Sequence, residues 1–141
     1  MTLPAGRGIA ENHSVGTMGC AECSGADAVA AWQASQRVRH AGVVEESHFS
    51  IRISACTCGQ RFVIVFTERV DWAGGEDDQT WLALPIAEEE EQLIAGADEA
   101  GAPRVVTELG RDRRFLVRAY PTRGEITVWW RDAGFAIGPH D

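Results

Sequence analysis

The sequence predicts an α+β domain: a mostly antiparallel sheet of about five strands, two covering helices and a four-cysteine zinc site. Three observations predict this fold. Apolar and polar residues alternate over residues 49–53, as in a half-buried strand. Segments rich in β-branched and aromatic residues follow at 61–67, 81–86, 114–120 and 125–131. Residues 25–39 and 87–97 have helical composition.

The length and composition suit one domain. The chain has 141 residues, 45% of them hydrophobic, which is enough to bury a core. We assign residues 1–17 to a flexible N-terminal tail and residues 18–141 to a single zinc-stabilised domain. No segment approaches the ~20 apolar residues of a membrane helix, and the first residues lack the apolar stretch of a secretion signal. We therefore expect a cytoplasmic protein without membrane contact.

Charge is unevenly distributed along the chain. Residues 1–60 contain five acidic residues and four arginines, a net charge of −1. Residues 61–110 contain twelve acidic residues and three arginines, a net charge of −9. Residues 111–141 contain four acidic residues and six arginines, a net charge of +2. The acidic middle repels a phosphate backbone, so we do not expect nucleic acid as a partner. All thirteen basic residues are arginine, a bias typical of high-GC bacterial genomes, and we expect a bacterial origin.

The first helix is predicted over residues 25–39, which are rich in Ala and Gln. Ser24 is placed to cap it, and Asp27 would lie in its first turn, where negative charge favours the helix N-terminus. Its apolar stripe is thin, mainly Val29 and Trp32, so we expect the helix on the surface of the core.

A β-hairpin is predicted next. Phe49, Ile51 and Ile53 fall on one face of a strand, and residues 61–67 form a second, more central strand. The connection between them holds Cys56 and Cys58 and is short, as in a hairpin. The two cysteines are therefore expected at the hairpin tip.

The second half alternates strands, a helix and loops. Residues 71–79 are predicted as a loop, 81–86 as a strand and 87–97 as a helix with four glutamates in its first turn. Residues 98–112 look irregular because they contain Gly101, Pro103 and Gly110. A turn at 121–124 separates the last two strands, and the tail after Asp132 is expected to be peripheral.

The four cysteines form two close pairs, Cys20–Cys23 and Cys56–Cys58, with none left over. Thiolates are strong ligands for zinc, and four of them close its tetrahedral shell. A structural zinc ion on all four thiolates is thus predicted. Since four cysteines leave no open coordination position, catalytic zinc is not expected.

This pattern resembles the zinc-ribbon and treble-clef class of four-cysteine modules. The resemblance is carried by residues 20–25, CAECSG, and by residues 56–59, CTCG, and it covers residues 18–67. It implies a structural zinc site with four cysteine ligands. The second pair is CxC rather than the common CxxC, and the first leads into a predicted helix.

Other uses of these cysteines stay open at the level of sequence. The cysteines could form disulfides, or Cys20 and Cys23 could be a redox-active pair at a helix N-terminus. Three cysteines could bind a metal together with His40 or His48, and the metal could be iron in place of zinc. Disulfides are disfavoured in a reducing cytosol, and the strand that precedes a thioredoxin-type motif is missing.

Two further features are candidate partner-binding surfaces. The first is the acidic loop, with Asp71, Glu76, Asp77 and Asp78; Glu68 precedes it, and no histidine lies near it in sequence. The alternative interpretations are that the loop is only solvated or that its carboxylates are catalytic, and the catalytic role is the least expected. The second is the pair Trp129 and Trp130, since adjacent strand residues face opposite sides and one must look away from the core.

The functional hypothesis is a small zinc-binding protein that acts through protein–protein interaction, in a narrower form as an inhibitor or immunity-type protein whose acidic face neutralises a basic partner. The alternatives are a nucleic-acid-binding zinc-ribbon protein and an enzyme with an unrecognised site. We lean against an enzyme, because no Ser/His/Asp signature, phosphate loop or dinucleotide motif is present.

Overall fold

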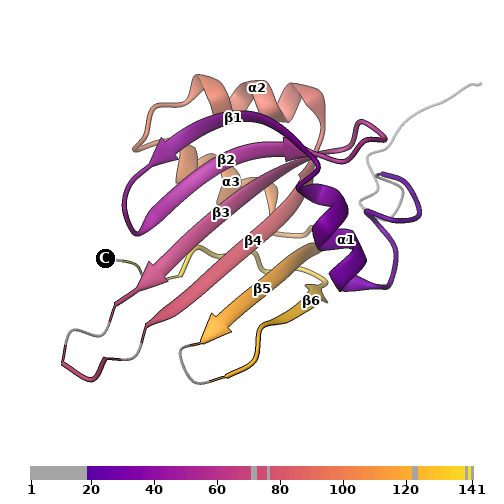
Figure 1. Cartoon of the computed structure of the whole chain (residues 1–141). Coiled ribbons are helices and arrows are strands. Elements are labelled where there is room, and N and C mark those ends of the chain that lie inside the picture. Colours follow the sequence, from indigo (N-terminus) through magenta and orange to yellow (C-terminus); the bar gives the residue numbers. More distant parts are fainter. Residues whose placement is uncertain (1–18, 71–72, 76, 122–123, 139, 141) are drawn as a thin grey trace, which may run out of the picture.

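The computed structural model describes residues 19–70, 73–75, 77–121, 124–138 and 140. Its strands all belong to one six-stranded antiparallel sheet in the order β1-β2-β3-β4-β5-β6 (Figure 1). The elements in chain order are α1 (Ala28–Ser35), β1 (Val38–Glu45), β2 (Phe49–Ala55), β3 (Arg61–Arg69), β4 (Asp78–Ile86), α2 (Glu88–Gly96), α3 (Ala102–Leu109), β5 (Phe115–Pro121) and β6 (Thr127–Arg131). None of the helices in these ranges has the length and apolar content of a membrane span.

The predicted α+β class is confirmed. Every strand pairs with the strand that precedes it, so the sheet is an antiparallel meander with α2 and α3 inserted between β4 and β5. The sheet has six strands rather than about five, and three helices are described rather than two. The predicted N-terminal tail, residues 1–17, lies outside the described residues.

One face of the sheet, here called the α2/α3 face, packs against α2 and α3. Side chains alternate between the faces along each strand, and this face takes the odd-numbered residues of β2 and β3 and the even-numbered ones of β4. Its buried core is Ile51, Ile53, Val63, Val65, Leu82, Leu84, Ile86, Phe115 and Val117, closed by Ile94, Ala102 and Val106 from the helices. This is the larger of the two cores.

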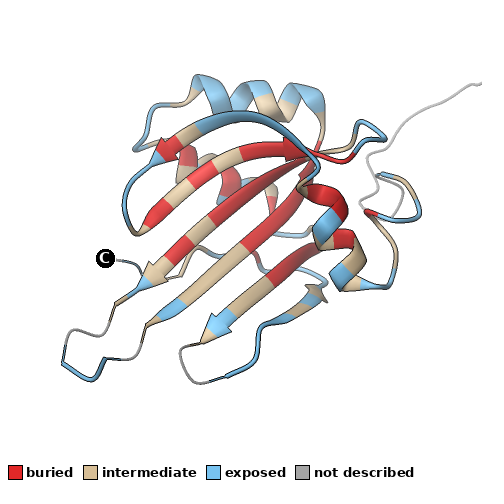
Figure 2. Cartoon of the chain, viewed as in Figure 1, coloured by how far each residue is buried: buried red, intermediate tan, exposed pale blue. Residues whose placement is uncertain are grey.

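The opposite face, here called the α1 face, packs against α1 and the cysteines. Its buried members are Cys23, Ala31, Ala34, Cys56, Phe62, Ile64, Ala83 and Leu116. Helix α1 lies over one end of this face, and the other end carries half-buried residues (Figures 1 and 2). The two central strands are therefore buried on both sides only where α1 crosses them.

The predicted helix over residues 25–39 was too long. Asp27, not Ser24, caps α1 by accepting a hydrogen bond from the Ala30 N–H at 3.1 Å. The helix ends at Ser35, and β1 begins at Val38. Strand β1 was missed because it is an edge strand, largely exposed, whose two pairing irregularities against β2 break the alternation that identifies a strand.

Two predictions for the C-terminal half were wrong. Residues 98–112 contain α3, in which Pro103 stands in the first turn, where its missing N–H costs nothing. The tail after Asp132 is not peripheral: Phe135 is 3% exposed and its ring meets Phe115 edge-on at 5.1 Å. The Phe135 N–H also donates to the Gly110 carbonyl at 3.3 Å, so the tail closes the α2/α3 face.

Two adjacent apolar residues of α2 allow a test of how this helix packs on the α2/α3 face, because one is buried and the other is exposed. Ile94 is fully buried and Leu93 is 61% exposed. We expect Ile94→Ala to lower the free energy of unfolding by about 2–5 kcal/mol, measured by urea denaturation. Leu93→Ala is the matched control and should change it by less than about 0.5 kcal/mol. Equal effects would contradict the assigned packing of α2.

Candidate metal centre

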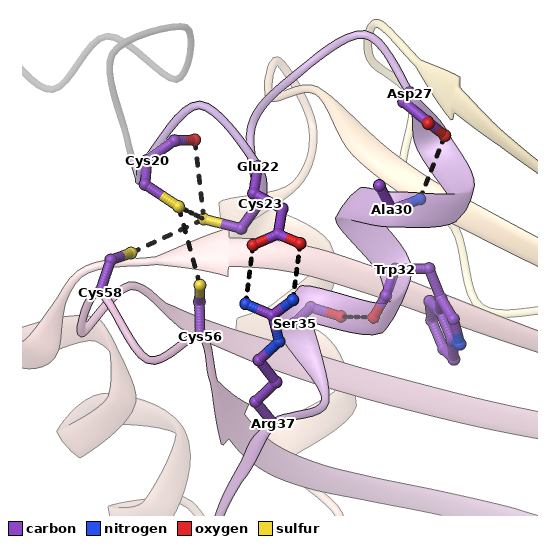
Figure 3. A network of polar contacts seen from close by, with 10 residues as sticks. All are labelled: Cys20, Glu22, Cys23, Asp27, Ala30, Trp32, Ser35, Arg37, Cys56 and Cys58. Atoms are coloured by element: carbon purple, nitrogen blue, oxygen red, sulfur yellow. Dashed lines mark hydrogen bonds and ion pairs between the residues drawn. The ribbon is translucent and has the colours of Figure 1, made fainter.

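The structure brings all four cysteines into one cluster (Figure 3). Cys20 and Cys23 come from the segment before α1, whereas Cys56 and Cys58 come from the turn between β2 and β3. The Sγ atoms of Cys20 and Cys23, of Cys20 and Cys56, and of Cys23 and Cys58 are each 3.8 Å apart. All four sulfurs lie within 4.8 Å of one another, so the cluster is placed to hold a metal ion.

The first pair of sulfurs is presented by a tight turn. The backbone N–H and the hydroxyl of Ser24 both donate to the Cys20 carbonyl, at 3.0 and 2.6 Å. Gly19 has a φ of +87°, and a Cβ there would lie 2.5 Å from the Cys23 sulfur. Glycine is needed at this position because any side chain would collide with a cluster sulfur in a strained backbone conformation.

The second pair is presented by the hairpin tip, as predicted. The Cys56 N–H donates to the Gln60 carbonyl, and the Gly59 N–H donates to the Cys56 carbonyl, both at 2.9 Å. Gly59 has a φ of +100°, which glycine adopts without strain. The Gln60 amide donates to the carbonyls of Arg61 and Ile86, at 2.8 and 2.9 Å, and so fastens the tip to the end of β4.

Side chains from the C-terminal part of the chain contact the turn that presents Cys20 and Cys23. The Trp130 indole N–H donates to the Gly25 carbonyl at 2.8 Å. The Arg114 guanidinium lies 3.6 Å from the centre of the Trp130 ring and donates to the carbonyls of Ser24 and Gly25 at 3.3 and 3.4 Å. The turn therefore rests on β5 and β6 as well as on the cluster.

An exposed ion pair orients the same turn toward β1. Both oxygens of Glu22 accept hydrogen bonds from Arg37, at 2.7 and 2.6 Å (Figure 3). These hydrogen bonds hold the pKa of the Glu22 carboxyl below its usual range. Because both side chains are exposed to solvent over more than a third of their area, the pair adds little to stability and serves mainly to position the turn.

The protein environment acts differently on the individual thiols. Backbone N–H groups of Cys23 and Glu22 lower the pKa of the Cys20 thiol to about 6. Burial raises the pKa of the Cys23 and Cys56 thiols. Buried thiolates without a cation nearby are unfavourable, and a bound metal ion supplies that cation.

Several alternatives left open by the sequence do not fit this geometry. Sulfurs 3.8 Å apart are not disulfide-bonded, and all four cysteines are free. Helix α1 begins at Ala28, so Cys20 and Cys23 do not stand at its N-terminus, where a redox-active pair is expected. His40 faces Glu91 at 3.7 Å and His48 faces Glu68 at 3.0 Å, so neither histidine belongs to the cluster.

The predicted acidic loop is described in part. Asp71 and Glu76 lie outside the described residues; Asp78 is exposed at the start of β4, and Asp77 is half-buried. Glu68 is separate from them: it accepts a hydrogen bond from Gln79 at 2.9 Å and contacts His48. The Gln79 and His48 contacts lower the pKa of the Glu68 carboxyl. Sequence distance hid this His48–Glu68 pair, which forms because β2 and β3 are antiparallel.

The two adjacent tryptophans face opposite sides of β6, as strand geometry requires. Trp130 points to the α1 face and holds the turn before α1, so it is a structural residue rather than a free partner-binding one. Trp129 is 40% exposed on the α2/α3 side of this edge strand. Of the pair, Trp129 is therefore the more exposed.

Much of the acidic charge of α2 is neutralised within the molecule. Glu90 accepts two hydrogen bonds from Arg113, at 2.8 and 2.9 Å. Glu91 forms an ion pair with Arg61, and Glu88 lies 3.8 Å from the same arginine. The glutamate run was predicted as the first turn of a helix, and in the structure it also attaches α2 to the sheet.

Comparisons of the chain with known protein families, with curated proteins and with solved structures find no match. The cluster is compatible with a cysteine zinc module, and no family match assigns it to zinc ribbons or treble clefs in particular. Functional inference therefore rests on the geometry of the described residues.

The cluster generates a prediction about stability. Cys56 is buried, and its sulfur lies 3.8 Å from that of Cys20 in the other cysteine pair. We expect Cys56→Ser to abolish stoichiometric metal binding and to lower the free energy of unfolding by about 3 kcal/mol or more, with aggregation, because metal binding is coupled to folding. Metal content is measured by mass spectrometry and stability by thermal denaturation.

The matched control is Thr57→Ala. Thr57 stands between the two ligand positions but is exposed, so its variant should keep both metal content and melting temperature. A Cys56→Ser protein with unchanged metal content and melting temperature would show that the cluster is not a metal site.

Proposed function

We propose that this chain is a small zinc-binding protein whose zinc ion is structural and is held by Cys20, Cys23, Cys56 and Cys58. The observation that carries the proposal is the spacing of the sulfurs, 3.8 Å for three pairs. A tetrahedron with metal–sulfur bonds of about 2.3 Å has sulfur–sulfur edges of about 3.8 Å. The side chains are therefore already arranged as the ligand shell of such an ion.

A structural role follows from the ligand number. Four thiolates fill the tetrahedral shell and leave no position for water or substrate. The ion joins the segment before α1 to the tip of the β2–β3 hairpin, two parts of the chain more than thirty residues apart in sequence. Its binding energy is then folding energy, because the unfolded chain has no preformed site.

Zinc is favoured over iron by the exposure of the site. Cys58 is exposed and Cys20 is partly exposed. Zinc has no redox chemistry, whereas an iron–thiolate centre in contact with solvent would be open to oxidation. Cysteines that form no disulfide also fit a reducing compartment, so we place the protein in a bacterial cytoplasm.

The role we propose beyond folding is binding of another protein. The closed ligand shell has no catalytic position, and the net charge of −8 opposes a nucleic-acid backbone. In the narrower inhibitor form, Asp77, Asp78 and the rest of the acidic loop would contact a basic partner. Trp129, exposed on the edge strand β6, would provide a separate apolar contact.

Metal analysis tests the zinc proposal. We expect the purified protein to contain one zinc ion per chain and to lack the visible absorption of iron–thiolate bonds. A strong chelator should remove the ion and lower the melting temperature, and added Zn²⁺ should restore it. Hydrogen exchange should show the largest loss of protection in α1 and at the hairpin tip, with α2 and α3 little changed. Four freely titrating thiols in untreated protein would overturn the proposal.

Capture from an extract of the source organism tests the binding role. We expect the tagged, zinc-loaded protein to retain a protein partner after nuclease treatment, identified by mass spectrometry. The chelated protein is the control. Loss of a basic partner at high salt would support the inhibitor form. Retention of nucleic acid alone, released by nuclease, would contradict the protein-binding role.

A further inference from the structure

Half of the α1 face is left open by the helix. The strand registers define rows of residues that cross this face. The row Ile64, Ala83 and Leu116 lies under α1, and all three residues are fully buried. Arg52, the β2 neighbour of Ile64, is half-buried beside Gln36, which follows α1. The next row is Ser50, Phe66, Trp81 and Arg118, and all four residues are only half-buried. Figure 2 shows this change along β3 and β4.

The open row carries an aromatic shelf with a fixed cation. The rings of Phe66 and Trp81 lie 5.1 Å apart on neighbouring strands. The Arg118 guanidinium lies 4.4 Å from the centre of the Trp81 ring and 5.8 Å from that of Trp32. Arg118 forms no ion pair with any residue that the structure describes. The indoles orient this charge without neutralising it.

A cavity of about 350 Å³ adjoins this shelf over β1 and β2. It is lined by Arg39 and Arg52, by Gly42, which lacks a side chain, and by Ser50, whose strand neighbour on β3 is Phe66. The Arg52 guanidinium donates to the Gln36 amide oxygen at 2.7 Å, which fixes its position. The irregular pairing of β1 with β2 brings Arg39 to the same cavity.

Both guanidinium groups of the cavity lack a carboxylate partner among the described residues. Burial, and secondly the charge of Arg39, lower the pKa of Arg52, as is expected for a cation without an anion beside it. His40 also lines the cavity but faces Glu91 at 3.7 Å. Glu45 is the acid of the cavity wall; its carboxylate lies against Gly42 rather than on an arginine.

The surrounding charges favour a short acidic peptide over a nucleic-acid strand. A strand carries a phosphate at every nucleotide, so it would meet Glu45 in the cavity wall and Glu68 on β3, in a chain of net charge −8. A peptide places its carboxylates locally. Arginine binds carboxylates through two parallel hydrogen bonds, and the shelf accepts an apolar side chain beside them.

We propose that the open half of the α1 face binds a short acidic segment of a protein partner, with carboxylates on Arg39 and Arg52 and an apolar side chain on Phe66 and Trp81. This inference rests on the proposed protein-binding role and names the surface and the chemistry of the partner. The partner that it implies is locally acidic at this face, whereas the inhibitor form concerns the acidic loop elsewhere on the molecule.

The probe is the blocked peptide acetyl-Glu-Glu-Phe-Glu-Glu-amide, titrated into zinc-loaded protein at low ionic strength. We expect saturable NMR shifts at the amides of Gly42, Ser50 and Arg52 and of the indole N–H of Trp81. A thymidine pentanucleotide, which also carries four negative charges, is titrated in parallel and should bind more weakly.

Three variants separate the cavity from general charge. Arg39→Gln should weaken peptide binding about tenfold, because the peptide loses one charged hydrogen-bonding partner. Arg39 is exposed and has no ion pair in the described part of the chain, so this variant should keep the fold. Arg104→Gln removes the same charge from an exposed position of α3, on the other side of the sheet, and should change affinity less than twofold. Glu45→Gln, which removes the competing acid, should strengthen binding severalfold.

Several outcomes would overturn the inference: equal weakening by Arg39→Gln and Arg104→Gln, absence of saturable shifts, shifts confined to another surface, or tighter binding of the oligonucleotide at the same residues. If the peptide fails while the extract yields a protein partner, the binding role stands and this surface is wrong. If the extract yields none while the peptide binds as expected, the surface stands and the wider role fails.

Discussion

The convergence of four sulfurs is the constraint on which the arrangement of the α1 face depends. Helix α1 has eight residues, too few to be stable alone in water. Its buried residues are Ala31, Ala34 and Ser35, which bring little apolar area to the sheet. What holds the helix is its two ends: the cluster at Cys20 and Cys23 before it, and a hydrogen bond from Ser54 to the Ser35 carbonyl at 2.7 Å after it.

The two faces of the sheet are therefore stabilised by different means. The α2/α3 face has an ordinary apolar core, to which Ile94, Val106 and Phe135 contribute from three separate segments. The α1 face relies on a short helix, a thiolate cluster and the Trp130–Arg114 contact with the turn at Ser24 and Gly25. Loss of the proposed metal ion should thus loosen one face while the other keeps its packing, since few contacts join α1 to α2 or α3.

The sequence predicts those features whose cause is local. Cysteine spacing, the alternation around Ile51 and the β-branched run of β3 are local signals, and they placed the cluster at a hairpin tip correctly. Strand β1 was hidden because an exposed, irregular edge strand needs no apolar alternation. Helix α3 did carry a signal, Ala102, Val105, Val106 and Leu109 at helical spacing, but Gly101 and Pro103 suggested irregular structure. Phe135 and the His48–Glu68 contact are long-range features without a local signature.

The cysteine cluster and the open surface have a common origin. Because Cys56 and Cys58 stand at one end of the β2–β3 hairpin, the cluster draws α1 to that end and leaves Phe66 and Trp81 uncovered at the other. A longer helix would bury the row that carries Arg118. Burying a guanidinium that has no ion pair among the described residues is costly. The short helix, its attachment at one end and the arginines beyond it are thus mutually consistent. The cluster that anchors α1 thus also decides which part of the sheet stays open.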